Sequence, residues 1–368
     1  MLQFIQHAQK DFLSCYLDDT PWPLGVLQLP HVQIQVLAQG IMAFRPVRET
    51  ENTNTEEPIK VQVAEQLDAW QGYPSMVLSA GVHGDETAPI ECLALMVQDI
   101  LSERLLLDMP CLFIFAHAKA TQAHVRYFDQ NLNRLFKEPK LETLSSNQSN
   151  QELVIANRIK TALADFYATT DSSMRWHFDL HCSIRPSRYP HFAISPVPID
   201  SKRTQRLHQA LAKLGLDAVV LSKQPSSTLS WFSHAYYEAH AATVELGKLK
   251  PLRQNNLNDL AHFDQCIRAW LMDHQFDYRQ EQPHKTRYFE ATKVIDNQKQ
   301  IQFSALEDLT NFNRLPTHKP FAHDGDISYQ ADEGEVILFA NQSVEVGQRA
   351  ALIAKPLQDS TPRDCNQS

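Results

Sequence analysis

The sequence has no run of about 20 apolar residues, the length that a membrane-spanning helix requires. Its first residues, MLQFIQHAQKDFLSCYLDD, also lack the basic and apolar segments of a secretory signal. Basic residues are in deficit, because 34 Lys and Arg stand against 43 Asp and Glu and give a net charge of −9. A general nucleic-acid-binding protein needs a basic surface. We therefore expect a soluble protein that binds neither membranes nor nucleic acid.

Cysteine is also sparse, and the six cysteines form no CxxC pair and no regular spacing. This distribution argues against a disulfide framework, so we expect reduced thiols and a cytoplasmic location. A chain of 368 residues is long enough for a sizeable core and predicts about two domains, or one large domain with an appendage. Both a monomer and a homodimer fit the sequence.

Apolar runs alternate with helical patterns over much of the chain. SMVLSAGV, CLFIFAHA and RWHFDLHCS are typical of buried strands, and TAPIECLALMVQDIL predicts a helix with Thr87 as a cap and Pro89 in its first turn. This alternation favours an α/β fold with a mixed, mainly parallel sheet and helices on both faces. From about residue 285, short alternating strands and turn residues predict a small β-rich domain.

These patterns give a domain organisation. Residues 1–284 form the α/β domain, with a helix and strands from 1–47 packed on it. Residues 285–357 form the β-rich domain, and 358–368 form a frayed tail. The polar stretches 48–58 and 140–151 are expected to be exposed loops and are candidates for insertions.

Glycine is scarce, with ten residues in all, yet Gly81 and Gly84 flank one histidine in LSAGVHGDETAPIECL. Glycine is favoured where the backbone turns sharply or approaches another group closely. His83 and Glu86 lie on this turn as HxxE, and a hydrolytic zinc site often uses two histidines and one carboxylate. The spacing alone is weak evidence among 16 histidines and 43 acidic residues.

A third ligand is expected from another strand end of the same sheet. In WHFDLHCS, His181 ends an apolar run, and the carboxyl ends of neighbouring strands gather functional groups. The alternative is a hydrogen-bonded buried histidine. We expect His177 and Asp179 to point to other faces, His177 as a structural residue and Asp179 as a partner that orients a ligand. Asp85 and Thr87 have an alternative role as helix caps.

Two further segments carry polar residues in an apolar frame. VRYFDQNLNRLF places Arg126, Asn133 and Arg134 on a polar loop. TVELGK ends an apolar strand with Glu245, a carboxylate that is costly to bury without a partner. An ion pair between Glu245 and Lys248 is the structural alternative.

Together these segments resemble the succinylglutamate desuccinylase and aspartoacylase family, which has a zinc carboxypeptidase-like fold. The matching stretches are AGVHGDETAPIE, RYFDQNLNRLF, RWHFDLHCSIR and SHAYYEAHAATVELGK, in order over about 75–250. The first, third and fourth look more like the desuccinylase branch. The resemblance extends more loosely through the β-rich C-terminal part.

The resemblance implies one zinc ion per chain and a set of catalytic residues. Its implied zinc ligands are His83, Glu86 and His181. Glu245 would be the general base and acid, and Arg126 would help hold the oxyanion. Zinc would lower the pKa of a bound water toward neutrality.

The resemblance also implies an anionic substrate. Asn133 and Arg134 would bind a substrate carboxylate, and Arg185 is a candidate for a further contact. Arg188 is equally well explained as a solvated loop residue. The implied reaction is hydrolysis of N2-succinyl-L-glutamate to succinate and L-glutamate, in the succinyltransferase route of arginine degradation.

Three alternatives remain open at this point. The same chemistry could act on N-acetylaspartate or another N-acyl acidic amino acid, and a peptidase for longer chains is conceivable. A catalytically inactive metal-binding protein of the same fold is the non-enzymatic alternative. The chain also departs from the family at two positions, because relatives often carry Asn in place of Asp85 and Asp in place of Asn131. We expect Asp85 to add negative charge beside the ligands.

Overall fold

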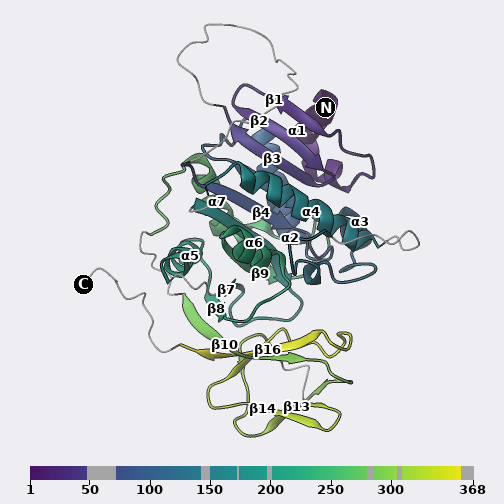
Figure 1. Cartoon of the computed structure of the whole chain (residues 1–368), viewed down its shortest axis with the longest axis vertical. Helices are drawn as coiled ribbons and strands as arrows, with labels where there is room; N and C mark the ends of the chain where they lie inside the picture. The colour runs from purple at the N-terminus through teal and green to yellow at the C-terminus, as the bar shows by residue number, and fades with distance from the viewer. Residues whose placement is uncertain are drawn as a thin grey trace, which may run out of the picture. The chain divides into compact units, whose positions relative to one another are not determined.

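The computed structural model describes residues 1–47, 72–141, 150–171, 174–196, 201–279, 286–304 and 309–357 (Figure 1). The stretch 48–58, most of 140–151, the expected boundary between 284 and 285 and the tail 358–368 lie outside the described residues. Among the residues that are described, no helix is long and apolar enough to cross a membrane.

The chain divides into two compact units. The first consists of Met1–His181, Pro225–Thr243 and Leu249–Tyr278, and the second of Cys182–Gln224, Val244–Lys248 and Arg279–Ser368. The division falls inside two strands. It lies between His181 and Cys182 in β6 (Arg175–Ser183), and between Thr243 and Val244 in β9 (His240–Lys248).

The first unit is built on a mixed sheet with the strand order β1-β2-β3-β5-β4-β6-β9. Strands β4, β5 and β6 are parallel, and β1, β2 and β3 continue the sheet as antiparallel strands. The strands are β1 (Gly25–Gln28), β2 (Val32–Ala38), β3 (Ile41–Pro46), β4 (Ser75–Ala80), β5 (Cys111–Phe115), β6 (Arg175–Ser183) and β9 (His240–Lys248). The register of β4 and β6 places Ser79 opposite Asp179.

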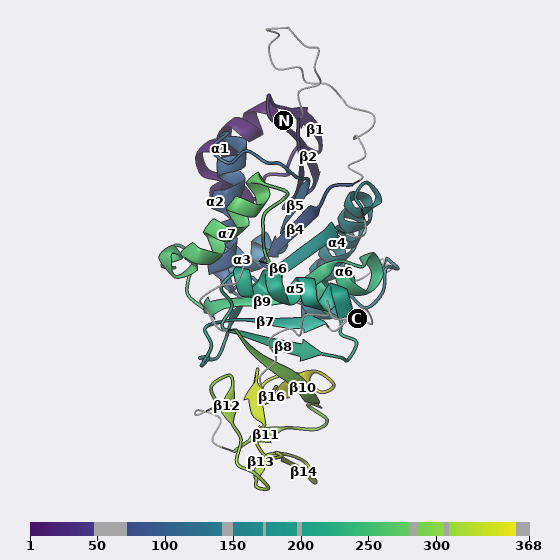
Figure 2. The same cartoon turned by 90° about the vertical axis from the view of Figure 1, so that its left-hand side faces the viewer.

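Helices cover both faces of this sheet. Figure 2 shows α1, α2 and α7 on one side and α4 and α6 on the other. The helices are α1 (Leu2–Leu17), α2 (Thr87–Leu101), α3 (Ala118–Ala123), α4 (Gln151–Ala168), α6 (Leu229–Tyr237) and α7 (Ala261–Met272), with short 3-10 turns η1 (Leu132–Arg134) and η3 (Leu257–Leu260). A buried apolar core between the sheet and α4 and α6 includes Val77, Ile114, Ile159 and Phe232.

Helix α2 begins at Thr87, as the sequence predicts, but Thr87 is not its cap. The N-cap is Glu86, and no side chain caps the helix. The Thr87 hydroxyl instead donates to the carbonyl oxygen of Lys250 at 2.7 Å. Thr87 also accepts from Asn255 at 2.8 Å, so the segment after β9 is held against the first turn of α2. The expectation that Asp85 or Thr87 caps the helix is wrong, because neither occupies the N-cap position.

Strand β6 is fixed at its N-terminal end by the guanidinium of Arg175. This side chain donates to the carbonyl oxygens of Tyr167 and Thr170 at the end of α4, the latter at 2.8 Å. It also donates to the carbonyl oxygen of Tyr237 at the end of α6, at 3.1 Å. The last carbonyls of a helix have no partner within the helix, so Arg175 satisfies acceptors of two helices at once. The strand that carries His181 is thereby fixed to both.

The second unit contains the strand order β7-β8-β10-β16-β15-β12 and a separate sheet β11-β13-β14. Strands β7, β8 and β10 are parallel, and the pairs that follow are antiparallel. Its elements are β7 (His191–Pro196), α5 (Ser201–Lys213), β8 (Ala218–Ser222), β10 (Arg287–Asp296), β11 (Gln302–Phe303), β12 (Asn313–Arg314), β13 (Pro320–Asp324), β14 (Ile327–Gln330), β15 (Val336–Leu338) and β16 (Arg349–Pro356). The described residues from 286 onward form strands and no helix. The predicted α/β class with a β-rich C-terminal part is confirmed, and its parallel strands are flanked by antiparallel ones.

Candidate metal centre and active site

The turn after β4 depends on its two glycines. Gly81 has φ +71°, in the left-handed region that glycine tolerates. At Gly84, an added Cβ would lie 2.3 Å from the carbonyl carbon of Ala120, far inside van der Waals contact. The turn therefore packs directly on the backbone of α3, and this close approach places His83 and Glu86 on one side of it.

Three side chains converge on one point, as the sequence predicts. Nδ1 of His83 lies 2.9 Å from Oε1 of Glu86, and Nδ1 of His181 lies 2.7 Å from Oε2 of Glu86. The two imidazole centroids are 5.1 Å apart, and all three residues are buried. One ligand atom from each lies within 4.8 Å of the others.

The hydrogen bonds around this cluster determine where the imidazole protons lie. Oδ1 of Asn131 accepts from the backbone N–H of Asn133 at 3.0 Å, which identifies that atom as the oxygen. Because an amide oxygen only accepts, Nε2–H of His83 donates to it at 3.1 Å. Likewise, Nε2–H of His181 donates to Oδ2 of Asp179 at 2.9 Å. Both Nδ1 atoms therefore face Glu86, and a ring that is neutral, with its one proton on Nε2, presents Nδ1 as a bare lone pair.

A bare nitrogen lone pair against a carboxylate favours a cation between them. Burial lowers the pKa of His83 to about 4, with the Arg126 charge adding to the effect, so its Nδ1 carries no proton. Burial also opposes protonation of His181, but the charges of Asp179 and Glu86 outweigh it and raise its pKa well above the usual value. The cluster thus attracts one positive charge, either a proton or a metal ion. Two imidazoles and one carboxylate are a donor set that fits zinc.

Arg126 completes the charge balance beside this cluster. Its Nη1 lies 2.8 Å from Oε1 of Glu86 and 3.9 Å from Oδ1 of Asp85. Burial and then the Glu86 charge raise the pKa of Asp85. The extra carboxylate of this chain therefore lies beside Arg126, whose own side chain is 31% exposed. Arg126 is held close by its backbone, because its carbonyl oxygen accepts from the N–H of Gly84 at 3.1 Å.

The loop that carries Arg126 is fixed by a buried contact between His117 and Glu152. Nε2 of His117 lies 3.0 Å from Oε1 of Glu152, and both side chains are at most 1% exposed. The same carboxylate accepts from the backbone N–H of Phe128 at 2.8 Å. Neither His117 nor Glu152 was singled out from the sequence, because the pair joins segments 35 residues apart without a motif.

Asn133 lies beside the cluster and Arg134 turns back on the chain. Oδ1 of Asn133 accepts from the backbone N–H of Leu229 at 2.9 Å, which leaves its Nδ2 3.5 Å from Nε2 of His181. Arg134 is half-buried and donates to the carbonyl oxygen of Asn133 at 3.0 Å. The structure thus brings Asn133 together with His83, Glu86 and His181.

The remaining predicted residues, Glu245 and Arg185, belong to the second unit. Glu245 is buried on β9 and accepts a hydrogen bond from the Ser183 hydroxyl at 3.1 Å. Arg185 is half-buried, and its Nε donates to the carbonyl oxygen of Ala340 at 2.6 Å. Glu245 lies within β9, and Arg185 follows β6, the strand that carries His181.

One expectation about β6 is wrong. His177 and Asp179 were expected to point to other faces than His181, but Asp179 contacts His181 and both Asp179 and His177 contact Ser79. Side chains along a strand alternate with a period of two, so residues 177, 179 and 181 share one face. The expected role of Asp179 as the partner of a ligand agrees with its 2.9 Å contact to His181.

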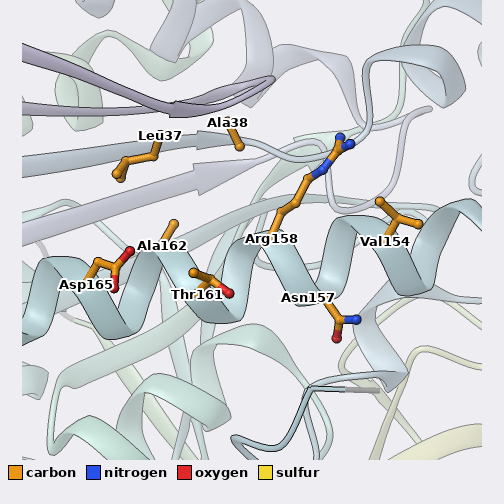
Figure 3. A pocket seen from close by; sticks show the side chains of 8 residues that line it. All are labelled: Leu37, Ala38, Val154, Asn157, Arg158, Thr161, Ala162 and Asp165. Carbon is orange, nitrogen blue, oxygen red and sulfur yellow. The ribbon is translucent and has the colours of Figure 1, made fainter. Parts of the chain in front are cut away.

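A cavity of about 290 Å³ lies elsewhere in the first unit, between β2 and α4 (Figure 3). Its lining mixes aliphatic and polar side chains: Leu37, Ala38, Val154, Asn157, Arg158, Thr161, Ala162 and Asp165. No residue of the predicted site lines it. The described residues therefore place the candidate chemistry at the His83–Glu86–His181 cluster rather than at this cavity.

Comparisons with known proteins agree with this geometry. Residues 73–271 match the family model of the succinylglutamate desuccinylase/aspartoacylase catalytic domain, and 284–357 match the AstE/AspA barrel-sandwich hybrid domain. The chain is 42% identical to succinylglutamate desuccinylase of Vibrio cholerae over 281 residues, which is 76% of this chain and 80% of that protein.

Solved structures show the same relationship. A crystal structure of the desuccinylase from Vibrio cholerae aligns with TM-score 0.79 at 36% identity, covering 94% of this chain and 95% of that one. The structure of the Vibrio parahaemolyticus enzyme aligns with TM-score 0.78 at 32% identity, covering 95% and 96%. The chain belongs to the succinylglutamate desuccinylase/aspartoacylase family.

Proposed function

We propose that this protein is a metal-dependent amidohydrolase that cleaves N2-succinyl-L-glutamate into succinate and L-glutamate. The carrying observation is that Nδ1 of His83 and Nδ1 of His181 both face the Glu86 carboxylate beside Arg126. Relatives that bear the name of this activity cover most of the chain, at 42% and 34% identity. In the reaction the amide C–N bond breaks, a C–O bond forms with water, and the amine leaves with one proton from that water.

The metal would be held by Nδ1 of His83, Nδ1 of His181 and the carboxylate of Glu86. We propose zinc, one ion per chain, because a set of two histidines and one carboxylate suits it. When bound, the ion would supply Lewis-acid polarisation and lower the pKa of a coordinated water.

Arg126 would bind the acyl oxygen. Its side chain is 31% exposed and is held beside Glu86, so its remaining N–H groups can reach a ligand. A fixed guanidinium stabilises negative charge that develops on the carbonyl oxygen as the tetrahedral species forms. We therefore assign Arg126 as an oxyanion-binding residue.

Glu245 would move the proton. A carboxylate within reach of the attacking water takes its proton as general base and later gives it to the leaving amine as general acid. The hydrogen bond from Ser183 would hold the carboxylate in one orientation. In this proposal Glu245 transfers the proton, and Arg126 stabilises the negative charge that develops on the carbonyl oxygen.

Asn133, Arg134 and Arg185 would bind substrate carboxylates. N2-succinylglutamate carries three carboxylates, and guanidinium groups recognise carboxylates with two parallel hydrogen bonds. Nδ2 of Asn133 offers N–H donors for such a carboxylate, because the side-chain oxygen is the atom that accepts from Leu229.

We also propose a cytoplasmic enzyme of arginine degradation whose residues 285–357 form a domain of their own. The location is supported by the thiols of Cys15, Cys92 and Cys111, which form no disulfide with another described residue.

Steady-state hydrolysis tests the proposal. Zinc-loaded protein would be given N2-succinylglutamate and, separately, N-acetylaspartate, beside a chelator-treated sample. We expect a preference for succinylglutamate of at least two orders of magnitude in kcat/KM, because the distal succinyl carboxylate finds a cationic partner. A preference for N-acetylaspartate would leave the hydrolytic chemistry and overturn the substrate assignment. Zinc binding without turnover of either compound would favour a noncatalytic protein or a peptidase.

A further inference from the structure

Behind the candidate metal centre, a continuous line of hydrogen bonds runs through the core of the first unit. It starts at Oδ1 of Asp179, which accepts from the Ser79 hydroxyl at 2.6 Å. The Ser79 oxygen lies 2.9 Å from Nε2 of His177, and Nδ1 of His177 lies 2.7 Å from the hydroxyl of Ser233 on α6. Ser79, His177, Asp179 and Ser233 are all at most 1% exposed.

The number of protons on each hydroxyl and on the ring of His177 determines which group donates and which accepts in each hydrogen bond of this line. Ser79 has one hydroxyl proton and uses it on Asp179, so its oxygen accepts from Nε2–H of His177. Burial lowers the pKa of His177 to about 4, although the Asp179 charge opposes this, so the ring is neutral and its Nδ1 has no proton. Ser233 therefore donates to Nδ1 of His177.

At the end nearest the candidate metal centre, Asp179 joins the line to the proposed ligand His181. Asp179 uses Oδ1 for Ser79 and Oδ2 for His181 at 2.9 Å. Nδ2 of Asn133 also approaches Nε2 of His181, but at 3.5 Å it is at the limit of a hydrogen bond, and the shorter contact decides where the proton lies. With its proton on Nε2, His181 presents Nδ1 to Glu86.

We propose that Ser233, His177 and Ser79 are positioning residues that hold the Asp179 carboxylate in one orientation and thereby fix the Nε2–H tautomer of the ligand His181. This inference rests on the proposed metal site but adds three residues that touch neither metal nor substrate. Partners behind a ligating histidine set its tautomer and ring orientation. Here the arrangement extends across β4, β6 and α6.

Ser75 provides a matched control within the same strand. It is a fully buried serine of β4, four residues before Ser79 and on the same face. Its hydroxyl makes no hydrogen bond to any described residue. Replacing Ser75 or Ser79 by Ala therefore removes the same buried group, and only at Ser79 does that group touch the line.

The tautomer can be read directly in the unmodified protein. Long-range 15N–1H correlation spectra of histidine-labelled, zinc-loaded protein report which ring nitrogen is protonated, and the His177→Gln variant assigns the signal. We expect His177 with a proton on Nε2 and a bare Nδ1. A proton on Nδ1, or on both nitrogens, would reverse the direction and overturn the proposal. This result does not depend on whether succinylglutamate is hydrolysed.

Zinc affinity, measured by competition with a chromophoric chelator, tests the consequence. We expect Ser79→Ala to weaken zinc binding by about 10–100-fold, the usual effect of removing a partner behind a ligand, and Ser75→Ala to leave it unchanged. His177→Gln keeps an amide N–H that can donate to Ser79, so it should bind zinc more tightly than His177→Leu. Equal zinc affinities for Ser79→Ala and Ser75→Ala, or for the Gln and Leu variants of His177, would overturn the proposal. These residues would then only pack in the core and would not position His181.

Discussion

The side-chain oxygen of Asn131 lies 3.1 Å from Nε2 of His83 and fixes the tautomer of this histidine. The sequence departs from the resembled family here, where relatives often carry Asp, and this weakens the argument that a carboxylate at position 131 orients the arginines. The contact shows how an amide oxygen can do what a carboxylate oxygen does. Its orientation is set by the backbone N–H of Asn133, so the amide cannot present its NH2 group to the ring.

An Asn131→Ala variant should lose this orientation. We expect zinc affinity to fall by about 10–100-fold, whereas Asn131→Asp should bind zinc as tightly as the natural protein or more tightly, because a carboxylate makes the ligand more basic. Chelator competition measures both variants. Weaker binding by the Asp variant would show that charge, and not hydrogen-bond direction, matters at this position.

Removing the metal should destabilise the fold around the cluster. Without a cation, the bare Nδ1 of the neutral His83 faces the buried carboxylate of Glu86. A ligand present at 100 times its Kd stabilises the folded state by about 2.7 kcal/mol, so chelation should lower the Tm and zinc should restore it. A Glu86→Gln variant is the control, because its Tm should no longer respond to zinc.

Glu245→Gln should separate proton transfer from metal binding. Loss of a general base or acid typically costs about 10²–10⁴-fold in rate, so kcat should fall within this range. Zinc content, measured by metal analysis after dialysis, should stay at one per chain, because Glu245 is not a proposed ligand. An active Glu245→Gln enzyme would remove this residue from the mechanism.

Gly84→Ala should damage the turn between the two ligands. The new Cβ would lie 2.3 Å from the carbonyl carbon of Ala120, so the turn must move away from α3. We expect a loss of about 1–3 kcal/mol in the free energy of unfolding, as for overpacked sites, together with weaker zinc binding. Gly347→Ala is the matched control. It has φ +85° but nothing within 4 Å of its added Cβ, so it should lose stability without affecting zinc.

Acid should destabilise the second unit through His208 on α5. Burial lowers the pKa of this histidine to about 4, and it lies 3.3 Å from the Ser195 hydroxyl. Between pH 6.5 and 4 the unfolded chain therefore binds a proton that the folded chain does not, and stability falls as the pH falls. From pH 7.5 to 5.0 this group should account for about 2 kcal/mol, since one pKa unit is about 1.4 kcal/mol.

The measurement is the free energy of urea unfolding at both pH values. The His208→Gln variant should lose less stability on acidification than the natural protein. If the His208→Gln variant lost the same free energy of unfolding on acidification as the natural protein, folding would not favour the neutral form of His208.

Much of the candidate site could be predicted because its proposed ligands lie at or just after the ends of apolar strands. His83 and Glu86 share one turn, and His181 lies on the neighbouring parallel strand, so strand order alone brings them together. The start of α2 was also predictable, from the polar residues before TAPIECLALMVQDIL. Resemblance to the family then assigned roles that spacing could not assign.

The partners behind the ligands could not be predicted in the same way. Ser79 and His177 meet through the register of β4 and β6, 98 residues apart, and a serine carries no signal for such a contact. The prediction that Thr87 caps α2 was wrong for a related reason. Its hydroxyl donates to the carbonyl oxygen of Lys250, 163 residues later. Long-range hydrogen bonds depend on which segments fold against each other, and local patterns contain no information about that.

The hydrogen bond between Thr87 and Lys250 bears on the order in which the protein is made. A ribosome completes His83 and Glu86 long before His181, which is 95 residues beyond Glu86, and later still adds the segment at 250–255 that clasps the first turn of α2. Domains fold as units during synthesis, and distant contacts form last. The nascent chain therefore carries an unfinished candidate metal site for much of its translation, and binding of the proposed ion would come at the end of that process.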